Sequence, residues 1–220
     1  MQVINLSDKP SLLNRYIKEI RSVSIQQDSM RFRRNIERIG EIMAVEISRA
    51  LNYKDEQVKT PLGIASVQVP ADSIVLGTIL RAGLPFHQGF LNMYDDAENA
   101  FLSAYRRAVV GRKGEEKLEI VSEYLAAPHL DGKTLLLVDP MLATGMSMEV
   151  AYKALLSHGT PKTVHLACTI GTTQAIEYLE KNMPAEATLW CATIDPELNE
   201  KKYIVPGLGD AGDLCFGTKL

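Results

Sequence analysis

Four short runs of Val, Ile, Leu and Thr, nearly free of charge, constrain the fold of this chain more than any other feature. They are SIVLGTIL (73–80), TLLLVD (134–139), TVHLACTI (163–170) and ATLWCATI (187–194). Such runs are typical of strands that are covered on both faces, as in a parallel sheet. Helical patterns separate several of them, MEVAYKALLSHG (148–159) and TTQAIEYLEKN (172–182). The alternation predicts an α/β fold with a mostly parallel sheet flanked by helices.

The first third of the chain follows another pattern. Apolar residues recur at helical spacing in two segments, which predicts a short amphipathic helix and then a longer one from about Ser29 (Leu13, Tyr16, Ile17, Ile20; Ile36, Ile39, Met43, Ile47). Asp28 or Ser29 is the expected N-cap of the longer helix. The next stretch, VKTPLGIASVQV (58–69), is punctuated by Pro61 and Gly63 and predicts extended structure with a turn. Further on, SAYRRAVV and KLEIVSEYLAA flank a turn-forming GRKGEE, which predicts an antiparallel flap over 103–126.

Composition bounds the function classes. The 220 residues are 46% hydrophobic and 23% charged, as in an ordinary globular protein, and we expect one domain over 1–220. A net charge of −3 argues against a partner that is a nucleic acid. No apolar run reaches the length of a membrane span, and the start MQVINLSDKP lacks a signal-peptide pattern, so we expect a cytoplasmic protein without membrane contact. Three cysteines without metal-ligand spacing indicate buried thiols (Cys168, Cys191, Cys215).

The stretch TLLLVDPMLATGMSMEV (134–150) places polar residues directly after the most apolar strand. In open α/β sheets ligands bind beyond the carboxyl ends of the strands. Ala143, Thr144 and Gly145 turn the chain into a helix near Ser147, and the free N–H groups at such a helix start form an anion site. Asp139 cannot bind phosphate, so a sugar hydroxyl is its natural partner. An anion site next to a carboxylate that binds sugar hydroxyls suggests a ribose 5-phosphate as the ligand. An ordinary strand–turn–helix joint with capping residues explains this stretch equally well.

The C-terminal stretch YIVPGLGDAGDLCFGT (203–218) holds four glycines and two aspartates. Tyr203, Ile204, Leu208 and Phe216 would anchor it, unlike a polar tail. Glycines held between apolar neighbours indicate a backbone shaped around a flat ligand, and alternating N–H and C=O groups can pair with the edge of a pyrimidine.

These segments resemble those of a known family, the uracil phosphoribosyltransferases. VDPMLATGMS (138–147) is similar to the ribose-phosphate signature of that family, and YIVPGLGDAGD (203–213) to its uracil-binding loop. ILRAGL (79–84) and RFRRNIERIG (31–40) are similar to two further family segments. The resemblance implies a type I phosphoribosyltransferase-like fold with a hood, an antiparallel flap at about 99–128, and a base-binding loop and hood at 195–220.

The resemblance also implies a reaction. Uracil and 5-phospho-α-D-ribose 1-diphosphate would give UMP and diphosphate, as in pyrimidine salvage. Mg²⁺ would be held mainly through the diphosphate, without dedicated protein ligands. A homodimer or a higher homo-oligomer, and allosteric control by a GTP effector, are further family traits that would apply.

The roles of single residues follow from the same resemblance. The implied catalytic residues are Asp210, Arg106 and Arg81. The implied contacts to 5-phosphoribosyl 1-diphosphate are Arg81, Arg106, Asp139, Pro140, Met141, Leu142, Ala143, Thr144, Gly145, Met146, Ser147 and Asp210. The implied uracil contacts are Ile204, Gly209, Asp210 and Ala211.

Departures from the family pattern keep two alternatives open. Met146 stands where the family usually has a second glycine, and the flap sequence also differs, so a phosphoribosyltransferase for another nucleobase is one alternative. A non-catalytic regulator that senses UMP or phosphoribosyl diphosphate is the other. His87 is expected to be structural, and Arg31, Arg33, Arg34 and Arg38 are expected to form a solvated face paired with Glu37 and Glu41.

Overall fold

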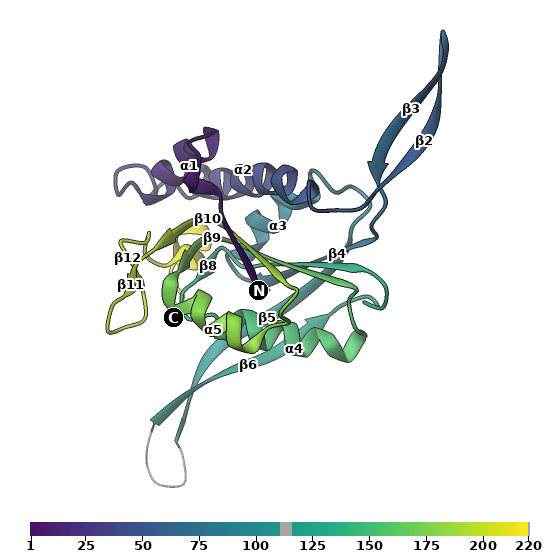
Figure 1. Cartoon of the computed structure of the whole chain (residues 1–220). Coiled ribbons are helices and arrows are strands. Elements are labelled where there is room, and N and C mark those ends of the chain that lie inside the picture. Colours follow the sequence, from purple (N-terminus) through teal and green to yellow (C-terminus); the bar gives the residue numbers. More distant parts are fainter. Residues whose placement is uncertain (111–115, 220) are drawn as a thin grey trace.

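The computed structural model describes residues 1–110 and 116–219, with side chains described outside 104–123. A central sheet crosses the molecule in the order β1-β10-β9-β7-β4-β5-β6, and the short β8 pairs with β9 (Figure 1). All neighbours in it are parallel except β5 and β6, which are antiparallel. The expected mostly parallel sheet is confirmed. Its strands are β1 (Gln2–Asn5), β4 (Ile74–Leu80), β5 (Glu98–Val110), β6 (Glu116–Ala126), β7 (Thr134–Val138), β8 (Met141–Leu142), β9 (Thr163–Thr172) and β10 (Thr188–Asp195).

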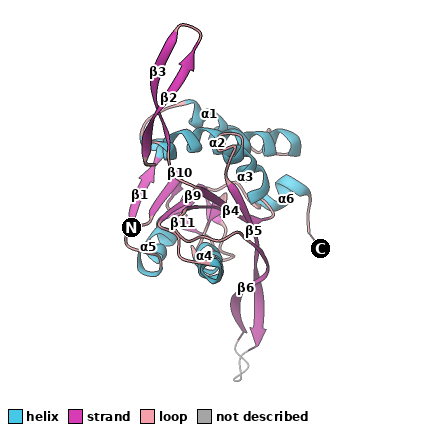
Figure 2. Ribbon diagram, turned by 90° about the vertical axis from the view of Figure 1, so that its right-hand side faces the viewer, coloured by secondary structure: helices cyan, strands magenta, loops and turns pink. Residues whose placement is uncertain are grey.

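Helices cover both faces of this sheet (Figures 1 and 2). One layer holds α1 (Leu12–Arg21), α2 (Ser29–Ser48) and α3 (Gly83–Leu91), and the other holds α4 (Met146–Leu155) and α5 (Thr173–Asn182). Successive side chains of a strand point to opposite faces. In β7, Leu136 and Val138 therefore join the α1–α3 core, while Leu135 and Leu137 join the α4–α5 core. Burial on both sides explains why the sequence shows continuous apolar runs instead of alternation.

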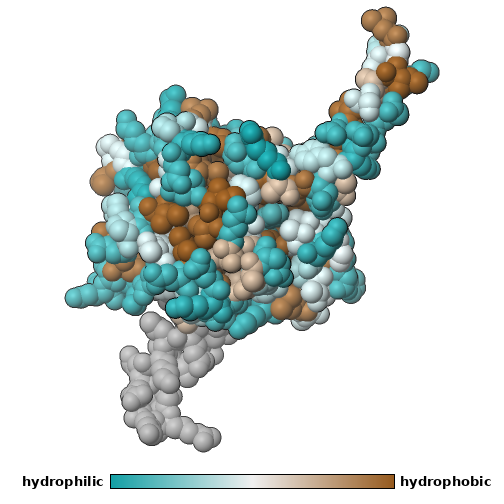
Figure 3. Space-filling view, in the orientation of Figure 1, coloured by the Kyte–Doolittle hydropathy of each residue, from teal (hydrophilic) through white to brown (hydrophobic). Residues whose placement is uncertain are grey.

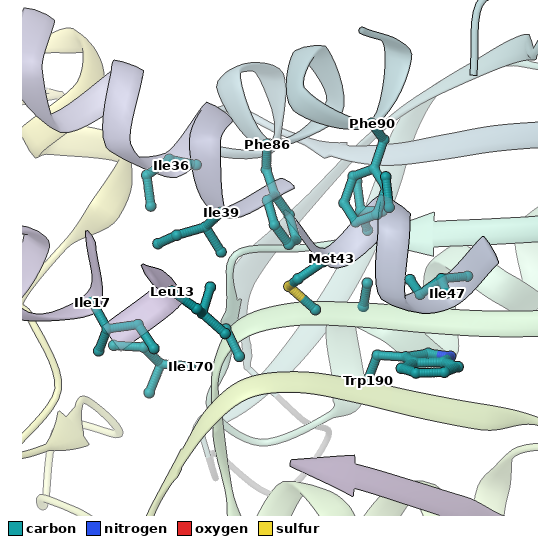
Figure 4. Close-up of a cluster of buried hydrophobic side chains, with 14 of the residues drawn as sticks. Leu13, Ile17, Ile36, Ile39, Met43, Ile47, Phe86, Phe90, Ile170 and Trp190 are labelled. Atoms are coloured by element: carbon teal, nitrogen blue, oxygen red, sulfur yellow. The ribbon is translucent and has the colours of Figure 1, made fainter. Parts of the chain in front are cut away.

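The larger core lies between α2, α3 and the sheet. Figure 4 shows Ile39 and Met43 of α2 near Phe86 and Phe90 of α3, with Trp190 of β10 beneath them. The apolar positions expected for α1 and α2 are buried, apart from the half-buried Tyr16. Asp28 is the N-cap of α2, because its carboxylate accepts a hydrogen bond from the amide of Arg31 at 3.0 Å.

Two antiparallel strand pairs project from the body (Figure 1). One is the extended end of β5 and β6. The other joins β2 (Tyr53–Thr60) to β3 (Gly63–Pro70), where extended structure with a turn was expected. The Thr60 hydroxyl accepts hydrogen bonds from the amides of Leu62 and Gly63 and so closes this turn. Figure 3 shows hydrophobic side chains on this pair far from the body.

The remaining elements follow β10. They are β11 (Glu197–Leu198), β12 (Ile204–Val205) and α6 (Ala211–Phe216). Ile204, Leu208, Ala211 and Cys215 of this segment are buried against the core of α1 and α2. This packing places the C-terminal segment beside the carboxyl ends of the parallel strands. None of the helices in the described ranges has the length and low charge required to cross a bilayer.

Candidate active site

A cleft of about 980 Å³ lies at the carboxyl ends of β4 and β7. Asp139, just after β7, and Asp210, in the C-terminal loop (residues 203–213), both line it. The two segments that sequence patterns indicated separately therefore face one cavity. Its lining consists of Ile79, Leu80, Arg81, Ala82, Ser103, Asp139, Met141, Ala143, Ser147, Lys201, Lys202, Tyr203, Ile204, Gly209, Asp210, Ala211, Gly212 and Lys219.

The Asp139 turn (residues 139–147) joins β7 to α4. Gly145 is the N-cap of α4, with φ +79, a left-handed conformation that glycine adopts without strain. No side chain caps this helix start. The first amides of a helix have no partner within the helix, and the helix dipole favours an anion beside them. The turn is therefore a suitable phosphate site, which is one of the two interpretations that the sequence left open.

Thr172 connects this turn to the start of α5. Its hydroxyl donates to the carbonyl oxygen of Ala143 at 2.7 Å and accepts from the amide of Ala175 at 3.0 Å. Thr172 is thus the N-cap of α5 and a fully buried link between α5 and the Asp139 turn. Because the Ala143 carbonyl is bound on that side, the orientation of the Ala143–Thr144 peptide is fixed. Sequence reasoning missed this residue, although a Thr before a helical pattern is an N-cap signal.

The Asp139 carboxylate sits in an unusual environment for a charge. Burial raises its pKa to about 7, against the single hydrogen bond that it accepts from the Met141 amide at 3.3 Å. Hydroxyl donors or a cation would stabilise the ionised form, since a buried carboxylate without such partners is costly. This geometry suits binding of a diol or of a metal-bound substrate.

We expect Asp139→Asn to stabilise the unliganded protein at alkaline pH. A carboxyl with a folded pKa near 7 and an unfolded pKa near 3.8 takes up protons on folding, so its ionisation costs stability as the pH rises between these values. The asparagine variant avoids this cost, on the order of 2 to 4 kcal/mol above pH 7. Thermal unfolding of wild type and variant near pH 4 and near pH 8 measures this difference in stability. We expect the variant to have the higher Tm only near pH 8. A gain that is equal at both values would contradict the account.

Arg81 follows β4 and reaches the cleft from the other side. Its guanidinium donates to the Asp213 carboxylate at 2.8 Å and to the Gly217 carbonyl at 3.3 Å. The peptide bond between Leu80 and Arg81 is cis. Because Arg81 is half-exposed at the cleft, it can contact a second anion while it remains paired to Asp213.

Ile204, Gly209 and Ala211 of the C-terminal loop line the cleft. Asp210 has a structural partner as well: its carboxylate accepts from the Asp213 amide at 3.0 Å and is the N-cap of α6. Its other oxygen lies 3.5 Å from the Lys219 ammonium. One oxygen of Asp210 is therefore committed to α6, and the other faces a cation.

Some expected residues lie elsewhere. Leu142, Thr144 and Gly145 border a smaller hollow of about 30 Å³ beside Asp139, and the Leu142 side chain is buried in the α4–α5 core, so Leu142 can offer a ligand only its backbone. Pro140 and Met146 line neither space. The backbone of Arg106 pairs with Ile120 in the flap, and the role expected for its guanidinium lies outside the described side chains.

Two sequence expectations need correction. Tyr203 and Phe216 were expected to anchor the C-terminal segment, yet each is 43% exposed; Ile204 and Leu208, the other expected anchors, are buried. Tyr203 instead lines the cleft, next to Lys201 and Lys202, which sequence reasoning did not single out. A pair of lysines resembles any solvated turn in a sequence, so no local signal identified them.

The basic stretch of α2 is only partly the solvated face that was expected. Arg34 pairs with Glu37 and Glu41, but Arg31 pairs with Glu19 of α1 at 3.1 Å and Arg33 donates to the Cys215 carbonyl at 2.6 Å. Residues of α2 thus join α2 to α1 and to α6.

Other residues match their expected structural roles. His87 is buried, with Nε2 2.8 Å from the Asn99 amide oxygen, as expected for a structural histidine. Trp190 and the thiols of Cys168, Cys191 and Cys215 are buried. Within the described residues, no group of three or more His, Cys, Asp or Glu side chains is arranged to hold a metal.

Comparison with known proteins connects this cleft to a family. Residues 7–218 match the family model described as uracil phosphoribosyltransferase. A uracil phosphoribosyltransferase from Porphyromonas gingivalis is 55% identical over 220 residues, 100% of both chains. Another from Methanothermobacter thermautotrophicus is 38% identical over 192 residues, which cover 86% of this chain and 85% of that protein.

Solved structures agree on the fold. A protein from Aquifex aeolicus is similar over the full length of both chains, with a TM-score of 0.83 and 28% identity. An adenine phosphoribosyltransferase from Trypanosoma brucei has a TM-score of 0.54 and 12% identity, covering 94% of this chain and 87% of that one, which supports the architecture alone.

Proposed function

The chain belongs to the uracil phosphoribosyltransferase family, and we propose that it forms UMP and diphosphate from uracil and 5-phosphoribosyl 1-diphosphate in the cleft described above. The observation that carries this proposal is that Asp139 and the C-terminal loop line the same cavity. A transferase must hold the ribose and the base within reach of one another, since correct placement of the two reactants supplies much of the rate enhancement.

The Asp139 turn would bind the phosphorylated sugar. The amides at the start of α4 and the hydroxyls of Thr144 and Ser147 would bind the 5-phosphate. Asp139 would accept hydrogen bonds from the two ribose hydroxyls, which would relieve the desolvation that raises its pKa. The remaining residues of the turn, Pro140 to Ala143, Gly145 and Met146, would shape the backbone around these groups.

The C-terminal loop would bind uracil through its backbone. Ile204, Gly209 and Ala211 line the cleft and would offer N–H and C=O groups to the edge of the base. Asp210 of this loop also lines the cleft and would lie near the bond that forms. Because one of its oxygens caps α6, we propose that Asp210 chiefly orients the reactants.

Charge on the leaving diphosphate needs stabilisation as the bond between C1 of the ribose and the diphosphate oxygen weakens. Arg81 lines the cleft and would take this role, and we propose that Arg106 of the flap approaches from the other side. Mg²⁺ fits the site, since it commonly binds substrate phosphates with one or two carboxylates, and both Asp139 and Asp210 line the cleft. When bound, it would neutralise charge on the diphosphate.

Neither alternative function gains support. Met146, whose departure from the family pattern suggested another base, belongs to the Asp139 turn and not to the C-terminal loop proposed to bind the base. A regulator that only binds nucleotide would not need a paired arginine such as Arg81 at the leaving-group side of the cleft. The relatives named above are uracil phosphoribosyltransferases.

We further propose that residues 1–220 act as one phosphoribosyltransferase domain, with a flap over 99–128 and a hood over 195–220, in the cytoplasm.

A homodimer or higher homo-oligomer is supported by the β2–β3 pair, where Leu62 is 99% exposed and Ile64 is 76% exposed. Two strands alone are marginally stable in water, so a partner surface would stabilise them. Light scattering measures the mass in solution, and GTP titration tests the proposed effector.

The reaction is tested directly with labelled 5-phosphoribosyl 1-diphosphate, Mg²⁺ and a panel of bases. We expect diphosphate release and UMP formation with uracil, and little product with cytosine or purines. Diphosphate release with another base but not with uracil would favour a phosphoribosyltransferase for that other base. Tight UMP binding without diphosphate release would favour a non-catalytic regulator.

The link between α5 and the Asp139 turn gives a further expected result. Thr172→Val keeps the size of the side chain but removes both hydrogen bonds, so the Ala143 peptide is no longer fixed and its half-buried carbonyl is left without its donor. We expect KM for 5-phosphoribosyl 1-diphosphate to rise about tenfold, the effect of roughly 1.4 kcal/mol. Thr172→Ser retains the hydroxyl and should stay close to wild type. Equal losses in the two variants would exclude the hydroxyl as the cause.

A further inference from the structure

A buried ion pair outside the cleft joins α1 to the C-terminal loop. Arg21, the last residue of α1, donates from its two terminal nitrogens to the two carboxylate oxygens of Asp195, at 2.7 and 2.8 Å. Asp195 ends β10 and is 4% exposed, and the Arg21 side chain is 21% exposed. Neither residue lines the cleft.

The same pair holds both backbone polar groups of one residue in the loop, Gly207. The Gly207 amide donates to the Asp195 carboxylate at 2.9 Å, and Arg21 donates to the Gly207 carbonyl at 3.1 Å. Gln26, just beyond α1, approaches the next carbonyl, that of Leu208, at 3.4 Å. The loop is therefore fastened through its backbone immediately before Gly209.

The loop leaves little room for another arrangement. Gly207 has φ +52, and a Cβ at this position would lie 2.9 Å from the carbonyl carbon of Ile204. Ile204 and Leu208 are buried on either side. The planar guanidinium can bind a carboxylate with two nitrogens and still donate to a carbonyl, which a lysine ammonium cannot reproduce in the same geometry.

We infer that Arg21 and Asp195 are positioning residues that hold the C-terminal loop in the shape that binds the nucleobase, and so set affinity for the base independently of affinity for the phosphorylated sugar. This inference rests on the proposed function. Its basis is that the pair fixes residue 207, two residues before Gly209, whereas its hydrogen bonds within the described part of the chain do not reach the Asp139 turn.

The test compares Arg21→Lys and Asp195→Asn with wild type. Both variants keep the size of the side chain and weaken the two-nitrogen pairing of Arg21 with Asp195. We therefore expect KM for uracil to rise about tenfold or more, while KM for 5-phosphoribosyl 1-diphosphate changes less than about twofold. Arg15→Lys is the matched control on the same helix, because Arg15 is exposed and its ion pair, with Glu19 at 3.5 Å, lies away from the C-terminal loop. It should leave both constants unchanged.

Direct measurements of ligand binding test the inference without catalytic turnover. Affinity for UMP should fall in both variants while affinity for ribose 5-phosphate stays unchanged, and hydrogen exchange should accelerate at residues 207–209. If the variants lose affinity for both ligands equally, or for neither, the inference is overturned. If wild type makes no UMP from uracil, the proposed function fails. The role of the pair in holding the loop is then tested by hydrogen exchange alone, and unchanged hydrogen exchange at residues 207–209 in the two variants overturns the inference.

Discussion

Replacing Asp139 by asparagine is expected to lower kcat/KM for 5-phosphoribosyl 1-diphosphate by roughly 10²- to 10³-fold. Asparagine keeps the shape of the side chain but carries no charge, and it has one oxygen acceptor where aspartate has two. Hydrogen bonds to a charged acceptor contribute about 1.5 to 3 kcal/mol each, so the loss of two accounts for the expected factor. Steady-state kinetics with each substrate varied in turn measures it.

Loss of fold cannot explain such a result. The same variant is expected to be more stable than wild type near pH 8, because burial raises the pKa of the Asp139 carboxyl to about 7. Asp95→Asn removes an exposed carboxylate that lies outside the cleft and is the matched control. An unchanged kcat/KM in Asp139→Asn, or an equal fall in the control, would mean that Asp139 does not bind the sugar.

The largest loss of stability is expected from Gly89→Ala in α3. A Cβ at Gly89 would lie 2.9 Å from the carbonyl carbon of Glu37 and 3.0 Å from the amide nitrogen of Glu41, both backbone atoms of α2. The two helices pack with Gly40 and Gly89 at their contact, so an added methyl group must push them apart. We expect a loss of about 3 kcal/mol or more and a Tm lower by roughly 6–12 °C.

Gly63→Ala is the matched control for this prediction. A Cβ at Gly63 meets nothing within 4 Å, so the same chemical change adds no clash there. Thermal unfolding of the two variants isolates the effect of the helix contact. If Gly89→Ala were no less stable than Gly63→Ala, the close approach of α2 and α3 would not exist in solution.

The parallel sheet could be predicted from the sequence because burial on both faces leaves continuous apolar runs such as TLLLVD. The N-cap of α2 could be narrowed to Asp28 or Ser29, of which the structure has Asp28, since capping depends on residues only three apart. The Asp139 turn could be placed because it follows a strand and begins a helix, a position where ligands commonly bind. Patterns of this kind are local, and the fold preserves them.

Long-range hydrogen bonds could not be predicted. Thr172 is 29 residues from Ala143, and Arg21 is 174 residues from Asp195. In the sequence, Thr172 has the pattern of any N-cap and Arg21 that of any exposed helical arginine. Tyr203 has an apolar ring in an apolar run, yet it lines the cleft, because the side of the loop that faces the core is already filled by Ile204 and Leu208.

The structure of the protein with UMP bound tests the central claim most directly. We predict the 5′-phosphate on the amides of residues 143–147, the ribose hydroxyls on the Asp139 carboxylate, and the uracil ring on the backbone of Ile204, Gly209 and Ala211. A nucleotide bound with its base away from the C-terminal loop, or with its phosphate away from the start of α4, would contradict the claim that this single cleft holds both reactants.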